Sequence, residues 1–399
     1  MAREEVTRVT QPAPTTPDKP TARSPHDQSV SRMLQRLDMT LDSDLDGFPH
    51  YADTSNGVWV TTPTGDWTGG FWPGTLWLAG AASGDPRYWT HARAWAQRLR
   101  ARATSQTIFR GFLFYYGAAL GALLASDQEA HAIALAGAAG LLGSYNEQAG
   151  IIPLGAEAEE AHSVGVNETN IDGVSASALL LWAADQTDDR ASREAGRSHA
   201  VRHIELCLRD DGSVAQSATF DARSGRCLRR YTHKGYTDES TWARAQAWGL
   251  LGFALAAGRL PDEPQLVSAC ERIADWWIDH IPDGLVARWD FDVPANQRAE
   301  NDTSATAITA AAMLKLAALV GDPAKSKRYR SFAHATVDAL TDGFLTACAA
   351  ADARPAGMLT EACYDHRIGL ATNSELIWGD YFLLEALAVL SDKVSPDAI

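Results

Sequence analysis

The chain has 399 residues, of which 46% are hydrophobic and 21% are charged, and it carries a formal net charge of -15. This length and composition allow one or two domains with a large buried core. The acidic balance excludes sequence-independent binding to nucleic acid, which needs a basic face. No uninterrupted apolar run reaches membrane-spanning length, so we expect a soluble protein that binds no membrane.

The N-terminal segment is polar and rich in proline, and it lacks the apolar stretch of a signal peptide. We therefore expect residues 1–28 to form a disordered tail, residues 29–399 to form one domain, and the protein to be cytoplasmic. No cofactor or metal is expected. The absence of a CxxC pair predicts reduced thiols for all five cysteines, which are Cys207, Cys227, Cys270, Cys348 and Cys363.

Apolar residues first recur at helical spacing over residues 28–44, and a loop is expected over residues 48–65. From there on, apolar helices rich in small residues alternate with more amphipathic helices. The apolar helices are expected at residues 66–82, 112–126, 171–187, 242–258, 302–320 and 376–391. Their amphipathic partners are expected at residues 28–44, 87–103, 127–145, 192–209, 263–281 and 323–345.

This alternation predicts the fold class. Helices that are apolar nearly all round must be buried, whereas amphipathic helices can face solvent. Six such pairs favour an all-α (α/α)6 barrel, in which six inner helices lie inside six outer ones. A helical solenoid is the alternative, and the unequal repeat lengths argue against it. Short polar and β-branched pieces between Asp211 and Tyr231 predict a small β-hairpin over one mouth of the barrel.

The run from Lys234 to Trp248, KGYTDESTWARAQAW, concentrates charged and aromatic residues at the entry of an apolar helix. Its Asp, Glu, Ser and Thr residues are typical of a helix N-terminus, so we expect the helix to begin near Ser240. Arg244 and Trp248 then share one helical face, which suits a polar pocket. The alternative is an ordinary buried helix whose arginine forms a salt bridge.

If the inner helices run in one direction, their N-terminal ends gather at one mouth, together with Asp66, Asp172, Asp238 and Asp302. An aspartate at such an end can cap its helix, which is the interpretation we favour for Asp302. Asp172 differs because it opens an otherwise apolar helix just after the polar string NETN. Its carboxylate would lie at the floor of the pocket, and position alone leaves a catalytic and a structural role equally open.

Aromatic side chains at or near the same ends would line a cleft in which sugar faces can stack. Core packing is the alternative for any one of them. No P-loop, dinucleotide-binding, GxSxG or HExxH motif occurs, which removes the commonest phosphate, hydride-transfer, serine-hydrolase and zinc-protease interpretations. The aromatic residues in question are Trp67, Trp72, Tyr115, Tyr236, Trp242, Trp248, Trp289 and Trp378.

Several strings resemble the unsaturated glucuronyl hydrolases, glycoside hydrolase family 88. They are DWTGGFWPGTLWLAG, NIDGVSASALLLWAA, KGYTDESTWARAQAWGLLGFA, RWDFDVP followed by DTSATAITAAAML, and LIWGDYFLLEALAVL, and they span about residues 30–392. The resemblance implies an (α/α)6 barrel and hydration of the C4=C5 bond of a terminal unsaturated uronic acid. It implies Asp172 as the catalytic aspartate, and Trp67, Trp72, Trp242, Arg244 and Trp248 as residues of the substrate cleft.

The chain also departs from this family at three places. Where the family has a second aspartate before a Gly-Phe pair, this chain has Phe109 or Arg110. Gln216 and Lys234 stand where the family has a histidine and a glutamine. The substitutions suggest a changed substrate or reaction, since Asp172 and the aromatic cleft are retained.

The leading hypothesis is therefore a hydrolase of small acidic saccharides or sugar conjugates, acting as a monomer or homodimer. A divergent lyase, isomerase or tailoring enzyme and a non-catalytic carbohydrate-binding protein are the alternatives. Because the ammonium of Lys234 would lower the pKa of Asp172, we further expect a second anion on the substrate to neutralise it.

Overall fold

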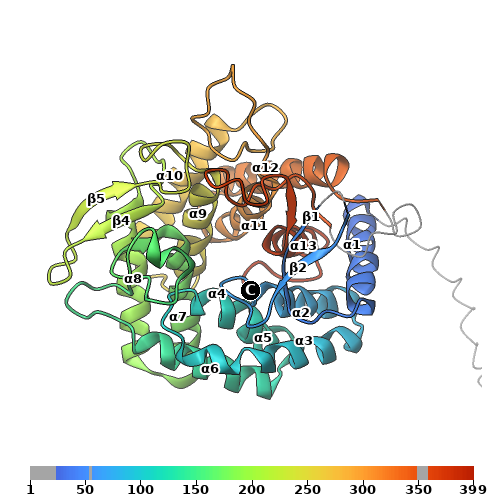
Figure 1. Ribbon diagram of the computed structural model, residues 1–399, viewed down its shortest axis with the longest axis horizontal. Helices are drawn as coiled ribbons and strands as arrows, with labels where there is room; N and C mark the ends of the chain where they lie inside the picture. The colour runs from blue at the N-terminus through green and yellow to red at the C-terminus, as the bar shows by residue number, and fades with distance from the viewer. Residues whose placement is uncertain (1–23, 54–55, 348–357) are drawn as a thin grey trace, which may run out of the picture.

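The structure is a computed structural model, and it describes residues 24–53, 56–347 and 358–399. In these ranges an inner ring of helices lies inside an outer ring (Figure 1). Contacts between neighbouring inner helices close the ring, with α13 beside α2, so the predicted (α/α)6 barrel is confirmed. The inner members are α2 (Phe71–Ser83), α4 (Arg110–Phe114) with η2 (Tyr115–Ala119) and α5 (Leu120–Ala125), α7 (Ala176–Thr187), α9 (Ala243–Ala257), α11 (Thr303–Leu319) and α13 (Ile377–Leu390).

The outer helices each follow or precede an inner partner along the chain. Unlike the inner helices, they bury one stripe only; the second of them, for example, buries Tyr88, Ala92 and Ala96. This spacing of four residues is that of an amphipathic helix. The outer members are α1 (Pro25–Asp42), α3 (Pro86–Arg98), α6 (Gln128–Leu142), α8 (Arg190–Cys207), α10 (Pro264–His280) and α12 (Pro323–Gly343). Short 3-10 turns lie in the connections between consecutive elements, namely η1 (Arg100–Thr104), η3 (Glu159–His162) and η4 (Ile171–Ser175).

Small residues allow the inner helices to approach one another closely. A Cβ atom added to Gly111 on α4 would lie 2.7 Å from the Cα of Ala176 on α7. A Cβ added to Gly252 on α9 would lie only 2.0 Å from the Cγ1 of Val174 in η4. Because the interior is close-packed, larger side chains at these positions would force the helices apart. The abundance of Ala and Gly in the apolar helices follows from this packing.

Two small antiparallel sheets lie beside the barrel. One joins β3 (Thr169–Asn170), β4 (Ser217–Phe220) and β5 (Cys227–Tyr231), and β4 and β5 form the predicted hairpin. The other has the order β2-β1-β6, from β1 (Phe48–Asp53), β2 (Trp59–Thr62) and β6 (Ser374–Leu376). The expectation of a loop over residues 48–65 is therefore wrong, because the β-branched and aromatic run at β2 pairs with β1 and the distant β6 completes the sheet.

Two helix starts differ from their predicted positions. α1 begins at Pro25, where Ser24 and Asp27 form a capping box, so residues 25–28 are helical and not part of a tail. The remainder of the predicted tail, residues 1–23, lies outside the described residues. α9 begins at Ala243, within one residue of the expected range 242–258 but three residues after Ser240, and the amide of Ala243 donates to the carbonyl of Trp289 in place of a side-chain cap.

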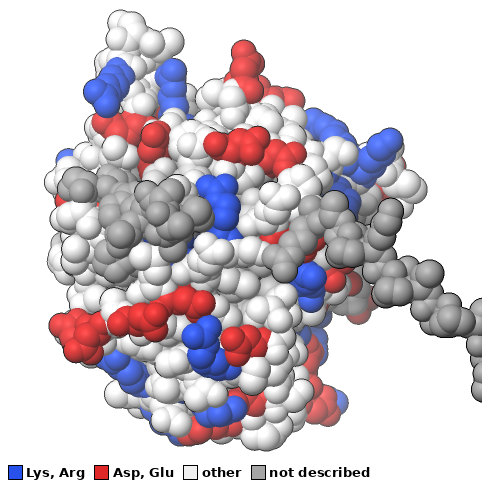
Figure 2. Space-filling model, turned by 90° about the vertical axis from the view of Figure 1, so that its right-hand side faces the viewer, with Lys and Arg blue, Asp and Glu red and all other residues white. Residues whose placement is uncertain are grey.

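The described residues also bear on membrane insertion, surface charge and the state of the cysteines. Among the described residues, no helix is both long and apolar enough to cross a membrane. On the face shown in Figure 2, acidic and basic side chains are interspersed and form no extended basic area. The four cysteines that the structure describes are free thiols, namely Cys207, Cys227, Cys270 and Cys363, while Cys348 lies outside the described residues.

Candidate active site

Asp172 lies in the 3-10 turn Ile171–Ser175, at the point where the chain enters α7. The turn is held by the side chain of Asn170, which accepts a hydrogen bond of 3.1 Å from the amide of Gly173. The hydroxyl of Ser175 donates to the carbonyl of Asp172 at 3.0 Å. The Asp172 side chain itself is buried, and its Oδ1 atom has no hydrogen-bond partner among the described residues. The local fold therefore fixes the backbone and leaves the carboxyl oxygen available.

The surroundings of Asp172 favour its protonated form. Burial, followed by the negative charge of Glu160, raises its pKa to about 7, against the opposing charges of Lys234 and Arg244. Removing a carboxylate from water disfavours its charge, and a second carboxylate nearby acts in the same direction. At neutral pH the side chain can therefore both hold and release a proton, as a general acid and base must.

A buried ion cluster lies beside Asp172. The ammonium of Lys234 is 3.1 Å from Oε1 of Glu160 and 3.9 Å from Oε2 of Glu159. The hydroxyl of Tyr364 donates to Glu159, and the amide of Lys234 donates to the side-chain oxygen of Gln216 at 2.8 Å. Burial alone would lower the pKa of Lys234, but the charges of Glu159 and Glu160 raise it well above its usual value. The lysine is therefore a paired cation.

This pairing corrects the expectation that a second anion on the substrate neutralises Lys234. The protein supplies that anion itself, through Glu159 and Glu160. The sequence analysis missed both glutamates because the segment AEAEEAHSV lies between helices and has no periodic pattern. Two adjacent acids a dozen residues before Asp172 were the only available signal.

Arg244 is held by structural contacts. Its Nη1 atom lies 2.6 Å from Oδ2 of Asp302, and its guanidinium also donates to the carbonyls of Cys363 and Tyr364. The guanidinium lies over the ring of Trp242, 4.4 Å from its centroid. Asp302 also caps α11, as predicted, by accepting from the amide of Ala305. These contacts match the salt-bridge alternative for this helix, since the arginine is already engaged.

An aromatic cluster fills the same mouth of the barrel. The centroid of Trp67 lies 6.0 Å from that of Phe109, and Phe112 connects the two to Trp248 at 4.9 Å. The indole nitrogen of Trp67 donates to the hydroxyl of Tyr364 at 3.1 Å, which links the aromatic cluster to the ion cluster. The structure thus brings Trp67, Phe109 and Trp248 together near Lys234 and its partners.

Comparison with known proteins identifies the family. No family model matches the chain. The chain is 34% identical over 356 residues to an unsaturated glucuronyl hydrolase of Bacillus sp. strain GL1, covering 88% of this chain and 92% of the relative. The chain belongs to the unsaturated glucuronyl hydrolase family. An unsaturated chondroitin disaccharide hydrolase of Streptococcus pyogenes serotype M1 is 28% identical and covers 90% of each chain.

Solved structures of unsaturated glucuronyl hydrolases share the fold. The crystal structure of the enzyme from Bacillus sp. GL1 superposes with a TM-score of 0.83 at 33% identity, covering 92% of this chain and 96% of that one. A variant of an unsaturated glucuronyl hydrolase in complex with dGlcA-Glc-Rha-Glc gives a TM-score of 0.85, also at 33% identity, covering 91% and 96%. An unsaturated glucuronyl hydrolase specific for heparin gives 0.84 at 27% identity, covering 92% and 98%.

Two expected site residues point elsewhere: Trp72, which the resemblance placed in the cleft, and Arg110, one of the two candidates for the altered acid position. Trp72 is fully buried, and its ring meets that of Trp95 on the outer helix α3 at 6.2 Å. The guanidinium of Arg110 donates to the carbonyls of Ala103 and Thr107 and to the hydroxyl of Ser144. Both side chains contribute to packing between inner and outer layers. Of the two candidates for the altered acid position, Phe109 is the one that reaches the aromatic cluster.

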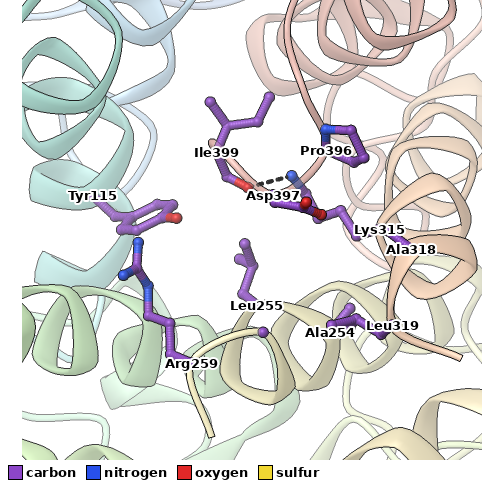
Figure 3. Close-up of a pocket in the computed structure, with 11 residues that line it drawn as sticks. Tyr115, Ala254, Leu255, Arg259, Lys315, Ala318, Leu319, Pro396, Asp397 and Ile399 are labelled. Atoms are coloured by element: carbon purple, nitrogen blue, oxygen red, sulfur yellow. Dashed lines mark hydrogen bonds between the residues drawn. The ribbon is translucent and has the colours of Figure 1, made fainter. Parts of the chain in front are cut away.

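Tyr115 belongs to the opposite end of the barrel, so the expectation of eight aromatic residues at one mouth is wrong. It lines a cavity of about 280 Å³ with Leu255, Arg259, Lys315 and Ile399 (Figure 3). Leu255 lies in the last turn of α9 and Arg259 just beyond its C-terminal end, whereas Arg244 lies at its N-terminal end. The reason for the error is that Tyr115 lies well inside an inner helix, beyond its first turn.

No group of three metal-ligating side chains lies around Asp172 among the described residues. The one such group in the described part of the chain joins α1 to α12 and consists of His26, His334 and Asp338. These three side chains form two ion pairs of 3.0 Å when the histidines are protonated. Because α1 and α12 are outer helices, the group is separate from the mouth that contains Asp172.

Proposed function

We propose that this glucuronyl hydrolase relative removes a terminal unsaturated uronic acid from a small saccharide or sugar conjugate, with Asp172 as general acid and base. The state of Asp172 is the observation that supports the proposal most. Its carboxyl group is buried, its pKa is near 7, and its Oδ1 atom is unpartnered within the described ranges. A carboxyl group in this state favours turnover over a purely carbohydrate-binding role.

The proposed reaction begins with protonation of the vinyl ether. The O–H bond of Asp172 breaks as the π electrons of C4=C5 form a new C4–H bond, which leaves an oxocarbenium-like centre at C5. Water adds its oxygen to C5 and returns a proton to the carboxylate of Asp172. The C5 hemiketal then opens, and the resulting hemiacetal at C1 expels the rest of the saccharide as an alcohol. One carboxyl group serves both proton transfers, so a two-carboxylate glycosidase pair is not required.

The aromatic cluster supports a saccharide as the substrate. Trp67, Phe109 and Trp248 supply flat apolar surfaces against which the C–H faces of a sugar ring pack. Their near-complete burial, together with that of Asp172, means that side chains at the mouth must move apart to admit a ligand. The hydrogen bond from Tyr364 to Glu159 joins two segments across this mouth, and it is the contact we expect to open.

A direct assay tests the proposal. The ultraviolet absorbance of the conjugated C4=C5 bond should fall when the protein is mixed with unsaturated glucuronyl disaccharides derived by polysaccharide lyases. Asp172→Asn should lose about 10²- to 10⁴-fold of the rate while keeping its fold and its ligand affinity, because it keeps the size of the side chain but not its proton. A variant that retains more than about a tenth of the rate would remove Asp172 from the mechanism.

We also infer that the protein acts in the cytoplasm as a monomer or homodimer. Sedimentation velocity of the purified chain would distinguish these two assemblies from larger ones, and fractionation of the source cells would test the compartment.

A further inference from the structure

The resemblance implies a second acid at the position of Phe109, and this chain has none there. Family resemblance places a second carboxylate there, but the ring of Phe109 lies parallel to that of Phe112, with centroids 6.0 Å apart and an angle of 3° between the planes. This place is apolar, so a carboxylate acting on Asp172 must come from another segment of the chain.

We propose that Glu160 is that second carboxylate, a positioning residue that keeps Asp172 in its acid form. Glu160 lies in η3, a segment distant in sequence from the start of α4, and only 5% of its surface is exposed. One of its oxygens is fixed 3.1 Å from the ammonium of Lys234. The other, Oε2, has no hydrogen-bond partner in the described part of the chain. Within this arrangement Glu160 is the charged neighbour that acts most strongly on Asp172.

The three departures from the family pattern then belong to one unit. Gln216 accepts a hydrogen bond of 2.8 Å from the amide of Lys234 and so fixes the backbone of the lysine. The amide of Ile171 donates to the carbonyl of Gln216 at 2.8 Å, which ties this unit to the turn that carries Asp172. The ammonium of Lys234 pairs with the carboxylate of Glu160 at 3.1 Å. Phe109 fills the vacated acid position.

The opposing interpretation is that Glu160 is only the counter-ion of Lys234. In that case its removal would act on Asp172 only through the unpaired ammonium of Lys234, and a double variant that also removes Lys234 would not lower the Asp172 midpoint. If Glu160 acts on Asp172, its replacement by glutamine removes a negative charge and leaves Lys234 less neutralised. Both changes favour the ionised form of Asp172, so its titration midpoint must move to lower pH.

The test measures the titration of Asp172 without substrate. The protein is labelled with ¹³C at the aspartate carboxyl carbon, and the Asp172 resonance is assigned by its loss in Asp172→Asn. Glu160→Gln should lower the midpoint by about one pH unit or more, and the alkaline limb of kcat/KM should move in the same direction. With a midpoint near 7, such a shift lowers the protonated fraction at pH 7 about fivefold.

Glu157→Gln is the matched control, since it removes the same charge three residues away in the same segment, at a position that is exposed. It should leave the Asp172 midpoint unchanged. If Glu160→Gln does not fold, the double variant Glu160→Gln with Lys234→Met removes both buried charges together. Because the charge of Glu160 acts on Asp172 more strongly than that of Lys234, the double variant should still lower the midpoint relative to wild type, by less than one pH unit; a raised midpoint would mean that Glu160 does not act on Asp172.

The role of Glu160 rests on the proposed function, but the two can fail separately. A lowered midpoint in a protein that hydrolyses no unsaturated saccharide would uphold the pairing of Glu160 with Asp172 and refute the proposed reaction. Hydrolysis of such saccharides with an Asp172 midpoint that is the same in wild type and Glu160→Gln would leave the reaction standing and overturn the role of Glu160.

Discussion

Asp172→Asn should make the protein more stable at alkaline pH, although it removes the catalytic proton. The folded protein raises the pKa of Asp172 from 3.8 to about 7. Each unit corresponds to about 1.4 kcal/mol, so the full difference amounts to about 4 kcal/mol. Structural relaxation around a buried charge reduces such a figure, which makes it an upper estimate.

The direction of the pH dependence follows from proton linkage. Between about pH 4 and pH 7 the folded protein keeps the proton of Asp172 while the unfolded chain has lost it. The stabilisation from Asp172 is therefore complete below the unfolded pKa and is lost as the pH rises through the folded pKa. Asparagine does not titrate, so the variant should gain stability over wild type across this window and keep the gain above it.

Thermal unfolding of wild type and Asp172→Asn at pH 5 and pH 8 tests this expectation. The difference in Tm between the two proteins should be several degrees larger at pH 8 than at pH 5. The other titrating groups are the same in both proteins, so their contributions cancel in this comparison. Asp283→Asn, at an exposed position, should show no such change. Equal differences in Tm at both pH values would mean that the fold does not raise the pKa of Asp172.

Three further changes test other parts of the structure. Arg244→Met should destabilise the fold by about 3–5 kcal/mol in denaturant unfolding, because it leaves Asp302 buried without its partner; adding Asp302→Asn should recover much of the loss. Gly252→Val should lower stability by about 1–3 kcal/mol and reduce turnover, since its Cβ would press on Val174 beside Asp172. Gly284→Ala is the control, because a Cβ there meets nothing within 4 Å, and it should be neutral in both assays. Unsulfated unsaturated disaccharides should be hydrolysed with higher kcat/KM than their sulfated counterparts, because Lys234 and Arg244 are already paired with carboxylates; a clear preference for sulfate would require a cation outside these pairs.

The barrel could be predicted because both kinds of helix have a recognisable pattern of apolar residues in the sequence. The inner helices are apolar all round, and the outer ones repeat their apolar residues at helical spacing, as in α3. The sheet β2-β1-β6 could not be predicted in the same way. Its strand β6 is three residues long and lies more than 300 residues after β1. Pairing at that separation is decided by tertiary structure and leaves little local signal.

The candidate site shows the same division. The position of Asp172 at the entry of an apolar helix followed from pattern. Helical spacing placed Arg244 on one face with Trp248, whereas the structure puts its guanidinium over the ring of Trp242. The partner of Arg244 did not, because Asp302 lies 58 residues away and already had a satisfactory role as a helix cap. A charged residue in a sequence has no visible partner, and its function depends on whether the fold has already neutralised it.

Lys234 illustrates why that distinction matters for the chemistry. Taken alone, its ammonium beside Asp172 would favour the carboxylate and oppose proton donation. In the structure two glutamates from η3 surround it, and the balance at Asp172 turns toward the acid form. The reaction needs a carboxyl group that keeps its proton near neutral pH; it does not need the second acid to come from a particular position in the chain. If Glu160 acts on Asp172 as proposed, a family member can exchange the acid at the start of α4 for a glutamate in η3, provided that a buried lysine is exchanged with it to pair with that glutamate.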